Sequence, residues 1–282
     1  MKNILVPTDF SNNAYNALYY ATQLFKEVDC RIYLLNVYSE HSELVSPSRQ
    51  KGDNRNLLVQ LQEEATEGLD QAFHRINLDA ANPKQLRKTI LRKGHLPDVI
   101  TQVVEEFEID LVVMGNTGHT DAIPVFMGSS AIKTVRALPK CPVLVVPREK
   151  ECEIPFEIAF TTDYKHNYDA QVLHPLTYMA KVCNAAVRII HINEEGRLSN
   201  KQKANLNTLR DYLGDIRHTI HWMPDFSSKT EVINTFIKEL GIGMLAMIYY
   251  RHGFLGTLMR ERVIKRISFE IDVPFLIIPE SY

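Results

Sequence analysis

The chain has no long apolar run, few cysteines and almost no net charge, and each absence excludes a class of protein. Its 282 residues carry a formal net charge of −2, which gives no general attraction to nucleic acid. No stretch approaches the ~20 consecutive apolar residues that a membrane helix needs. The apolar run before Pro7 is also too short for a secretory signal peptide. We therefore expect a cytoplasmic globular protein.

The four cysteines are scattered and include no C-x-x-C pair: Cys30, Cys141, Cys152 and Cys183. In a chain of this length, that pattern argues against a disulfide framework and against a zinc site. Free, buried thiols in a reducing compartment are expected instead. His191, His218 and His221 do not predict a metal site either, because residues three apart on a strand point to opposite faces.

Several catalytic signatures are also missing. The sequence contains no G-x-S-x-G, no H-E-x-x-H and no G-x4-G-K-[ST]. No G-x-G-x-x-G follows the first apolar run, which argues against a dinucleotide-dependent oxidoreductase. We therefore expect no enzyme of these classes.

What the sequence does contain is a regular alternation of apolar runs and amphipathic segments. The apolar runs predict buried strands, and the intervening segments have helical spacing. Continuous apolar strands separated by helices imply an α/β fold with a parallel sheet covered on both faces. The strands expected in the first half are residues 3–7, 31–37, 88–93, 110–114 and 142–147.

The second half repeats the first. Residues 157–163 match 3–9, residues 187–192 match 32–37, and residues 273–279 match 141–147. An internal repeat of this kind decides the fold. We expect two tandem copies of a five-stranded parallel-sheet, Rossmann-like domain, spanning residues 1–148 and 154–282. Pro175 falls within the first helix of the second copy and is expected to kink or delay it.

A glycine-rich stretch, residues 114–130, lies between an expected strand and an expected helix. Its spacing is G-x2-G-x9-G-S, made by Gly115, Gly118, Gly128 and Ser129. Glycine permits positive φ and close approach of a ligand, and a helix N-terminus attracts phosphate. Ligands of such sheets bind beyond the carboxyl ends of the strands. The stretch therefore predicts a phosphate site, and the alternative is a surface loop whose glycines only make turns.

The second copy lacks this stretch. Aligned from the preceding strand, Gly115 falls on Ile248 and Gly118 on Arg251. Aligned from the following proline pair, Gly128 and Ser129 fall on Arg260 and Glu261. Bulky side chains and a carboxylate would obstruct or repel a phosphate. We expect one nucleotide site per chain, in the first half.

Three segments together resemble the universal stress protein family: Pro-Thr-Asp-Phe-Ser at residues 7–11, the glycine motif, and Cys-Pro-Val-Leu-Val-Val-Pro at 141–147. The resemblance covers essentially the whole chain, as a tandem member with an adenine nucleotide alpha hydrolase-like fold. It implies a stress-response regulator that binds ATP in the first half. ADP or AMP are alternative occupants, and Mg²⁺ is an accompanying ion.

The family pattern also implies roles for individual residues. It places Asp9 at the adenine end of the nucleotide, the Val37 backbone at the base, and the glycine loop at the phosphates and ribose. The expected site comprises Pro7, Thr8, Asp9, Val37, Met114, Gly115, Thr117, Gly118, Gly128, Ser129 and Ser130.

Family members pair through their last strands. Residues 143–146 and 275–278 are therefore expected to pair within one chain as a pseudo-dimer, which would cover an exposed strand edge. A homodimer of whole chains is a further expectation.

For several of the expected site residues, a purely structural role is the alternative to ligand contact. Asp9 can hydrogen-bond backbone N–H groups where the strand turns into the helix. Ser129 can act as a helix N-cap. His119 and Thr120 are weaker candidates for phosphate contact. The strand-end residues Arg92, Lys93 and His95 face either the nucleotide or solvent.

The mode of action has alternatives too. Residues 115–129 include no Lys or Arg to neutralise a transferred phosphoryl group, so slow ATP hydrolysis is the most we expect. The alternative to a nucleotide-dependent sensor with an unidentified protein partner is a nucleotide-independent scaffold. That scaffold would act through the second half's basic residues, Arg251, Arg260, Arg262, Lys265 and Arg266. An adenylyl-transfer or pyrophosphatase enzyme is the third and least supported hypothesis.

Overall fold

The computed structural model describes residues 2–39, 54–116, 128–148, 153–192, 198–223, 229–250 and 272–280. The first half alternates strands and helices as expected. Its elements are β1 Lys2–Pro7, α1 Asn12–Leu24, β2 Cys30–Tyr38, α2 Asn54–Asp79, β3 Gln85–Lys93, α3 Leu96–Glu106, β4 Leu111–Gly115, α4 Ser129–Ala137 and β5 Val143–Val146.

The second half follows the same order as far as its fourth strand, and residues 251–271, between its last two strands, lie outside the described residues. Its elements are β6 Glu157–Thr161, α5 Ala170–Cys183, β7 Ala186–Ile192, α6 Asn200–Leu213, β8 His218–Met223, α7 Lys229–Glu239, β9 Met244–Tyr249 and β10 Phe275–Pro279. Pro175 lies inside α5, which starts seven residues after Asp163, whereas α1 starts three residues after Asp9. The helix thus starts later after its strand than α1 does, but it begins five residues before Pro175, so the expected effect of this proline remains a prediction.

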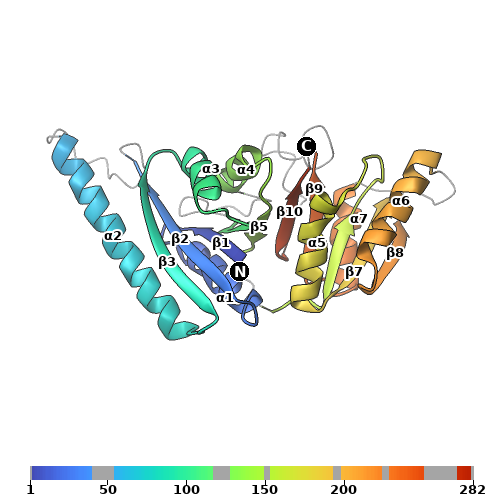
Figure 1. The fold of residues 1–282 in the computed structure, drawn as a ribbon, viewed down its shortest axis with the longest axis horizontal. Coiled ribbons are helices and arrows are strands. Elements are labelled where there is room, and N and C mark those ends of the chain that lie inside the picture. Colours follow the sequence, from blue (N-terminus) through green and yellow to red (C-terminus); the bar gives the residue numbers. More distant parts are fainter. Residues whose placement is uncertain are drawn as a thin grey trace.

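The ten strands form one sheet in the order β3-β2-β1-β4-β5-β10-β9-β6-β7-β8. Within each half all five strands are parallel. The halves join through the antiparallel pair β5–β10, in which Val145 faces Phe275 and Val143 faces Ile277. The α/β fold and the pairing of the last strands are therefore confirmed, and the pair lies at the junction of two adjacent halves (Figure 1).

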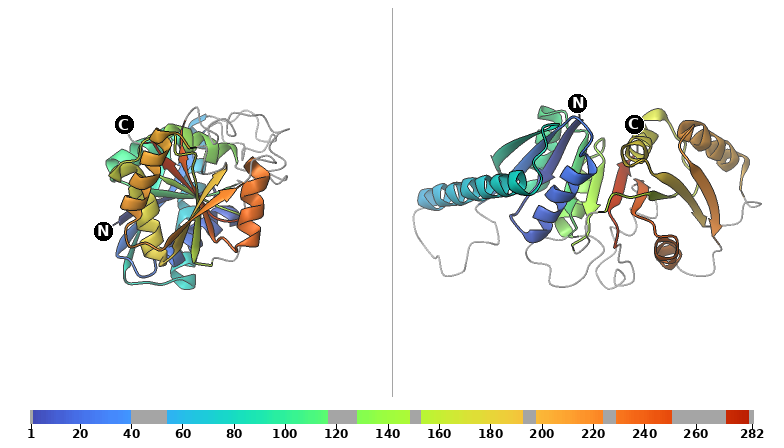
Figure 2. Two further views of the ribbon diagram at one scale, coloured as in Figure 1. Left: turned by 90° about the vertical axis from the view of Figure 1, so that its right-hand side faces the viewer. Right: turned by 90° about the horizontal axis from the view of Figure 1, so that it is seen from below.

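Helices cover both faces of the sheet, and each face has its own core. One core joins residues of α1, α2, α5 and α6, and the other joins residues of α3, α4 and α7. Both cores run through the two halves without interruption. The long helix α2 lies at the outer end of the first half (Figure 2).

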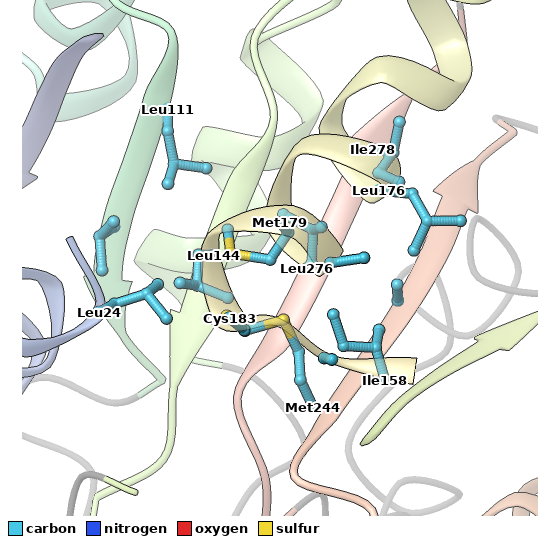
Figure 3. Close-up of a cluster of buried hydrophobic side chains, with 14 of the residues drawn as sticks. Leu24, Leu111, Leu144, Ile158, Leu176, Met179, Cys183, Met244, Leu276 and Ile278 are labelled. Carbon is cyan, nitrogen blue, oxygen red and sulfur yellow. The ribbon is translucent and has the colours of Figure 1, made fainter. Parts of the chain in front are cut away.

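The junction itself is apolar and buried. Leu144 of β5 and Leu276 of β10 are both 0% exposed, and Met179 of α5 lies next to them (Figure 3). Burying one such side chain contributes roughly 1.5–3 kcal/mol. The two halves therefore share hydrophobic contacts as well as strand hydrogen bonds.

Strand register gives the equivalence of the two halves directly. Ile4 faces Leu111 in the first half, and Ile158 faces Met244 in the second. Counting along β4 and β9 from these pairs places Ile248 at the position of Gly115, as the sequence alignment predicts.

The cysteines are free and buried at three positions: Cys30, Cys141 and Cys183. Burial raises the pKa of Cys30 to about 11, which keeps this thiol protonated near neutral pH. The fourth, Cys152, lies outside the described residues. No helix in the described ranges is long and apolar enough to cross a membrane.

Candidate nucleotide site

The turn after β1 is built by side chains that bind their own backbone. The Thr8 hydroxyl accepts a hydrogen bond from the Phe10 N–H at 3.0 Å, and Asp9 Oδ1 accepts one from the Ser11 N–H at 3.1 Å. Phe10 has a φ of 63°, in the left-handed region. Ser11 then caps α1, because its hydroxyl accepts from the Ala14 N–H. The structural role considered for Asp9 is thus present, through one of its two carboxylate oxygens.

The end of β2 lies beside this turn. Asn36 is buried, and its Nδ2 donates to the Thr8 carbonyl at 2.8 Å, which ties β2 to the residue before Asp9. Val37 follows and is partly buried. The structure therefore brings Thr8, Asp9 and Val37 together. The link is Asn36, which was not among the predicted site residues.

The end of β4 packs closely against α1. Met114 is buried, and Gly115 follows as the last residue of the strand. A Cβ on Gly115 would lie 2.4 Å from Asn13 Nδ2 and 3.2 Å from the Asn13 carbonyl oxygen. Glycine is required here because α1 approaches the strand so closely. This structural demand for Gly115 is separate from any contact with a ligand.

The N-terminus of α4 meets the end of β4. The Gly128 N–H donates to the Asn116 carbonyl, and the Asn116 N–H donates to the Val146 carbonyl at 2.9 Å. Gly128 is the N-cap residue, so the alternative of an N-cap at Ser129 is wrong. No described side chain caps α4, and Ser129 and Ser130 are exposed in its first turn. Uncapped N–H donors at a helix N-terminus attract anions.

Several predicted residues lie outside the described ranges. They include Thr117 and Gly118, the weaker candidates His119 and Thr120, and the second half's basic residues Arg251, Arg260, Arg262, Lys265 and Arg266. Within the described ranges, no group of three His, Cys, Asp or Glu side chains is arranged to hold a metal ion.

Arg92 and His95, at the end of β3 and just after it, make polar contacts at the surface. The Arg92 guanidinium donates to both carboxylate oxygens of Glu106, at 3.0 and 3.2 Å. His95 Nδ1 lies 3.3 Å from Asp98 on the first turn of α3. Both side chains are thus directed to α3, which favours the solvated-turn alternative for them.

The second half has the same backbone turn, but aromatic side chains bury it. Tyr164 N–H donates to the Thr162 hydroxyl and Lys165 N–H to Asp163 Oδ1, at 3.1 and 3.0 Å. Tyr164 has a φ of 56°, like Phe10. However, Tyr164 is fully buried and stacks on His191, with ring centroids 4.7 Å apart.

His191 stands where the first half has Asn36, and it makes the same kind of bond. Its Nδ1 donates to the Thr162 carbonyl at 2.9 Å, while Trp222 packs edge-on against its ring. Burial lowers the pKa of His191, so its ring is neutral near pH 7. Aromatic side chains thus cover the strand ends of the second half.

Fold and site together define an α/β protein whose first half brings strand ends and a helix N-terminus together at one edge of the sheet. The sequence profile described as the Universal stress protein family matches residues 1–147. The chain belongs to this family.

A universal stress protein of Methanocaldococcus jannaschii is 29% identical over 150 residues, which cover 53% of this chain and 84% of that protein. A solved structure of a universal stress protein from Archaeoglobus fulgidus matches with a TM-score of 0.71 at 17% identity, over 99% of this chain and 98% of its own. A solved structure of a candidate universal stress protein from Pseudomonas aeruginosa matches with a TM-score of 0.55 at 14% identity, over 99% of this chain and 93% of its own. These two structures support the fold across the entire chain.

Proposed function

We propose that the first half binds ATP at the carboxyl ends of β1, β2 and β4, and that the second half binds none. The observation that carries this proposal is the uncapped N-terminus of α4 beside Asn116. It offers N–H donors to phosphates, while the Asp9 turn and Val37 lie toward the base. Thr117 and Gly118 complete the proposed loop, and ADP or AMP would use the same contacts.

The proposed role is that of a cytoplasmic sensor in the stress response, with nucleotide binding changing a surface offered to a protein partner. We propose that the chain does not turn ATP over efficiently, because residues 115–129 contain no Lys or Arg to stabilise a transferred phosphoryl group. Mg²⁺ would then be held mainly by the phosphates. The proposed domain boundaries are residues 1–148 and 154–282.

The sharpest test changes the N-cap of α4. Gly128 has φ −62° and ψ 158°, a conformation that suits Asp and Asn at an N-cap. Gly128→Asp would place a carboxylate at the proposed phosphate position, whereas Gly128→Asn adds a side chain of the same shape without charge. We expect Gly128→Asp to weaken ATP binding at least ~100-fold in calorimetry, which corresponds to about 2.7 kcal/mol. Gly128→Asn should weaken it clearly less.

The wild-type titration provides the second half of the test. We expect one ATP per chain, and a melting temperature that rises with ATP but not with GTP or NAD. Two ATP per chain would refute the claim for the second half. Equal binding by Gly128→Asp and wild type, with both proteins folded by circular dichroism, would refute the site.

A further inference from the structure

A cavity of about 440 Å³ lies between the two halves at the opposite edge of the sheet. The first half contributes Lys2 at the start of β1, Asp110 before β4, and Lys140 before β5. The second half contributes one side of α5, including Gln171, His174, Tyr178 and Met179. The volume falls in the range of small-molecule sites, about 300–1,000 Å³.

The counterpart of this cavity, related by the repeat, is nearly closed. It measures about 80 Å³ and is lined by Tyr20 of α1, by Pro274 and by the linker residues Glu153, Ile154, Pro155 and Phe156. The register that equates Ile4 with Ile158 equates Lys2 with Phe156. The linker between the halves thus occupies one of two related clefts and leaves the other open.

The open cavity combines apolar walls with a small excess of positive charge. Its apolar lining is Ile4, Phe25, Ile109, Leu111, Pro142, Pro175, Met179 and Leu276. Lys2 and Asp110 form an ion pair at 2.8 Å, and the Lys2 ammonium also lies 4.8 Å from the centre of the Tyr178 ring. These two charges therefore balance each other.

The remaining charge comes from Lys140. Lys140 is exposed at the rim, and among the described residues it forms no ion pair. Burial lowers the pKa of His174, with a further contribution from nearby Lys2, so His174 is neutral near pH 7. One unbalanced cation beside apolar walls matches an apolar molecule with a single negative group.

We propose that this cavity binds a small amphipathic anion, with its apolar body between α5 and the junction of the two halves and its acidic group at Lys140. A medium-chain carboxylate is the representative of this class. The site is separate from the proposed nucleotide edge, because β1 has six residues and its two ends lie about 17 Å apart at ~3.3 Å per residue. A failure of the proposed ATP binding would therefore leave this proposal unaffected.

Calorimetry with sodium decanoate tests the proposal on the full chain, with 1-decanol as the uncharged comparison. Lys140→Glu should weaken decanoate binding at least tenfold and leave decanol binding nearly unchanged. Gln171→Trp, on the exposed side of α5 that lines the cavity, should abolish binding of both. Lys203→Glu and Lys203→Trp are matched controls, since Lys203 is an exposed residue of α6 away from the cavity.

The expected result is one decanoate per chain, bound at least tenfold more tightly than decanol, with both Lys203 controls like wild type. Saturating ATP should leave the decanoate affinity within twofold. Absence of decanoate binding, or affinity unchanged in both Lys140→Glu and Gln171→Trp, would overturn the proposal. Loss of binding in the Lys203 controls would do the same, because it would show binding away from the cavity.

Discussion

The two halves of the chain build the same turn and use it differently. In the first half, Phe10 is 37% exposed and leaves the strand ends accessible. In the second half, Tyr164 occupies the same backbone position, is 0% exposed and stacks on His191. In addition, α6 is hydrogen-bonded to this turn, because Asn205 Nδ2 donates to the Tyr164 carbonyl at 2.8 Å.

The comparison separates residues that the backbone conformation of the turn requires from residues that a bound ligand would require. Asp9 and Asp163 accept equivalent backbone hydrogen bonds, although only the first half retains the glycine motif. The aspartate alone is therefore poor evidence for a nucleotide. Within the described residues, the informative difference is Gly115 against Ile248, because the side chain at this position controls the space beside the strand ends.

The largest expected effect comes from removing the second half's aromatic residue. Tyr164→Ala should lower the free energy of unfolding by about 3–5 kcal/mol, as for other large buried aromatic residues. Phe10→Ala should cost about 1 kcal/mol or less, because its ring lies at the surface against Gly68. Both residues have positive φ, so the backbone contribution cancels in the comparison.

Urea unfolding of the two variants measures this difference. Equal losses of stability would mean that the two turns are packed alike, and the contrast between an accessible and a closed strand end would fail. Adding ATP to Tyr164→Ala extends the test, because a second binding event there would show that the aromatic side chain alone blocks the second half.

A smaller effect is expected at Gly115. Gly115→Ala should destabilise the fold by about 1–3 kcal/mol, because the new Cβ would meet the Asn13 side chain at 2.4 Å. In an Asn13→Ala background the same change should cost less, with a coupling of at least about 0.5 kcal/mol. The measurement is a double-mutant cycle by urea unfolding. Additive costs would show that Asn13 is not what requires glycine.

Much of the fold was predictable from the sequence, because the central strands are uninterrupted apolar runs. The strands at the two ends of the sheet were harder. β3 begins at Gln85, three residues before the expected start at Lys88, since its alternating polar residues suit a half-exposed edge. β8 followed only from the expected five-stranded repeat and was given no bounds of its own, and α6 was not predicted. β8 is nowhere fully buried, and a capping box at Ser199 was the available signal for α6.

The site was predictable only in part. The glycine spacing marked the loop, but Asn13, Asn36 and Asn116 act through contacts between segments far apart in the chain, which no local pattern reveals. Tyr164 was likewise hidden, because a tyrosine after a strand looks the same whether it is exposed or buried. The repeat offered one clue: Asn36 and His191 hold the same position, and both bind the carbonyl of the preceding turn.

The smallest expected effect concerns this last pair and its dependence on pH. The pKa of His191 is lowered by burial, whereas an unfolded histidine titrates near 6.5. Below about pH 6.5 the unfolded chain therefore binds more protons, so the stability due to neutral His191 is present above that pH and is lost as the pH falls. His191→Asn introduces the first half's residue and should reduce this loss. Urea unfolding between pH 5 and 8 measures it.

His221→Asn is the matched control, because burial lowers the pKa of His221 as well, but this ring is only partly buried at the sheet edge. Its effect on the pH dependence should be smaller than that of His191→Asn. If His191→Asn left the slope between pH 5 and 7 unchanged, the buried ring would not be held neutral. The stacked Tyr164–His191 pair would then have to admit a charge, and the second half would be less tightly closed than its geometry indicates.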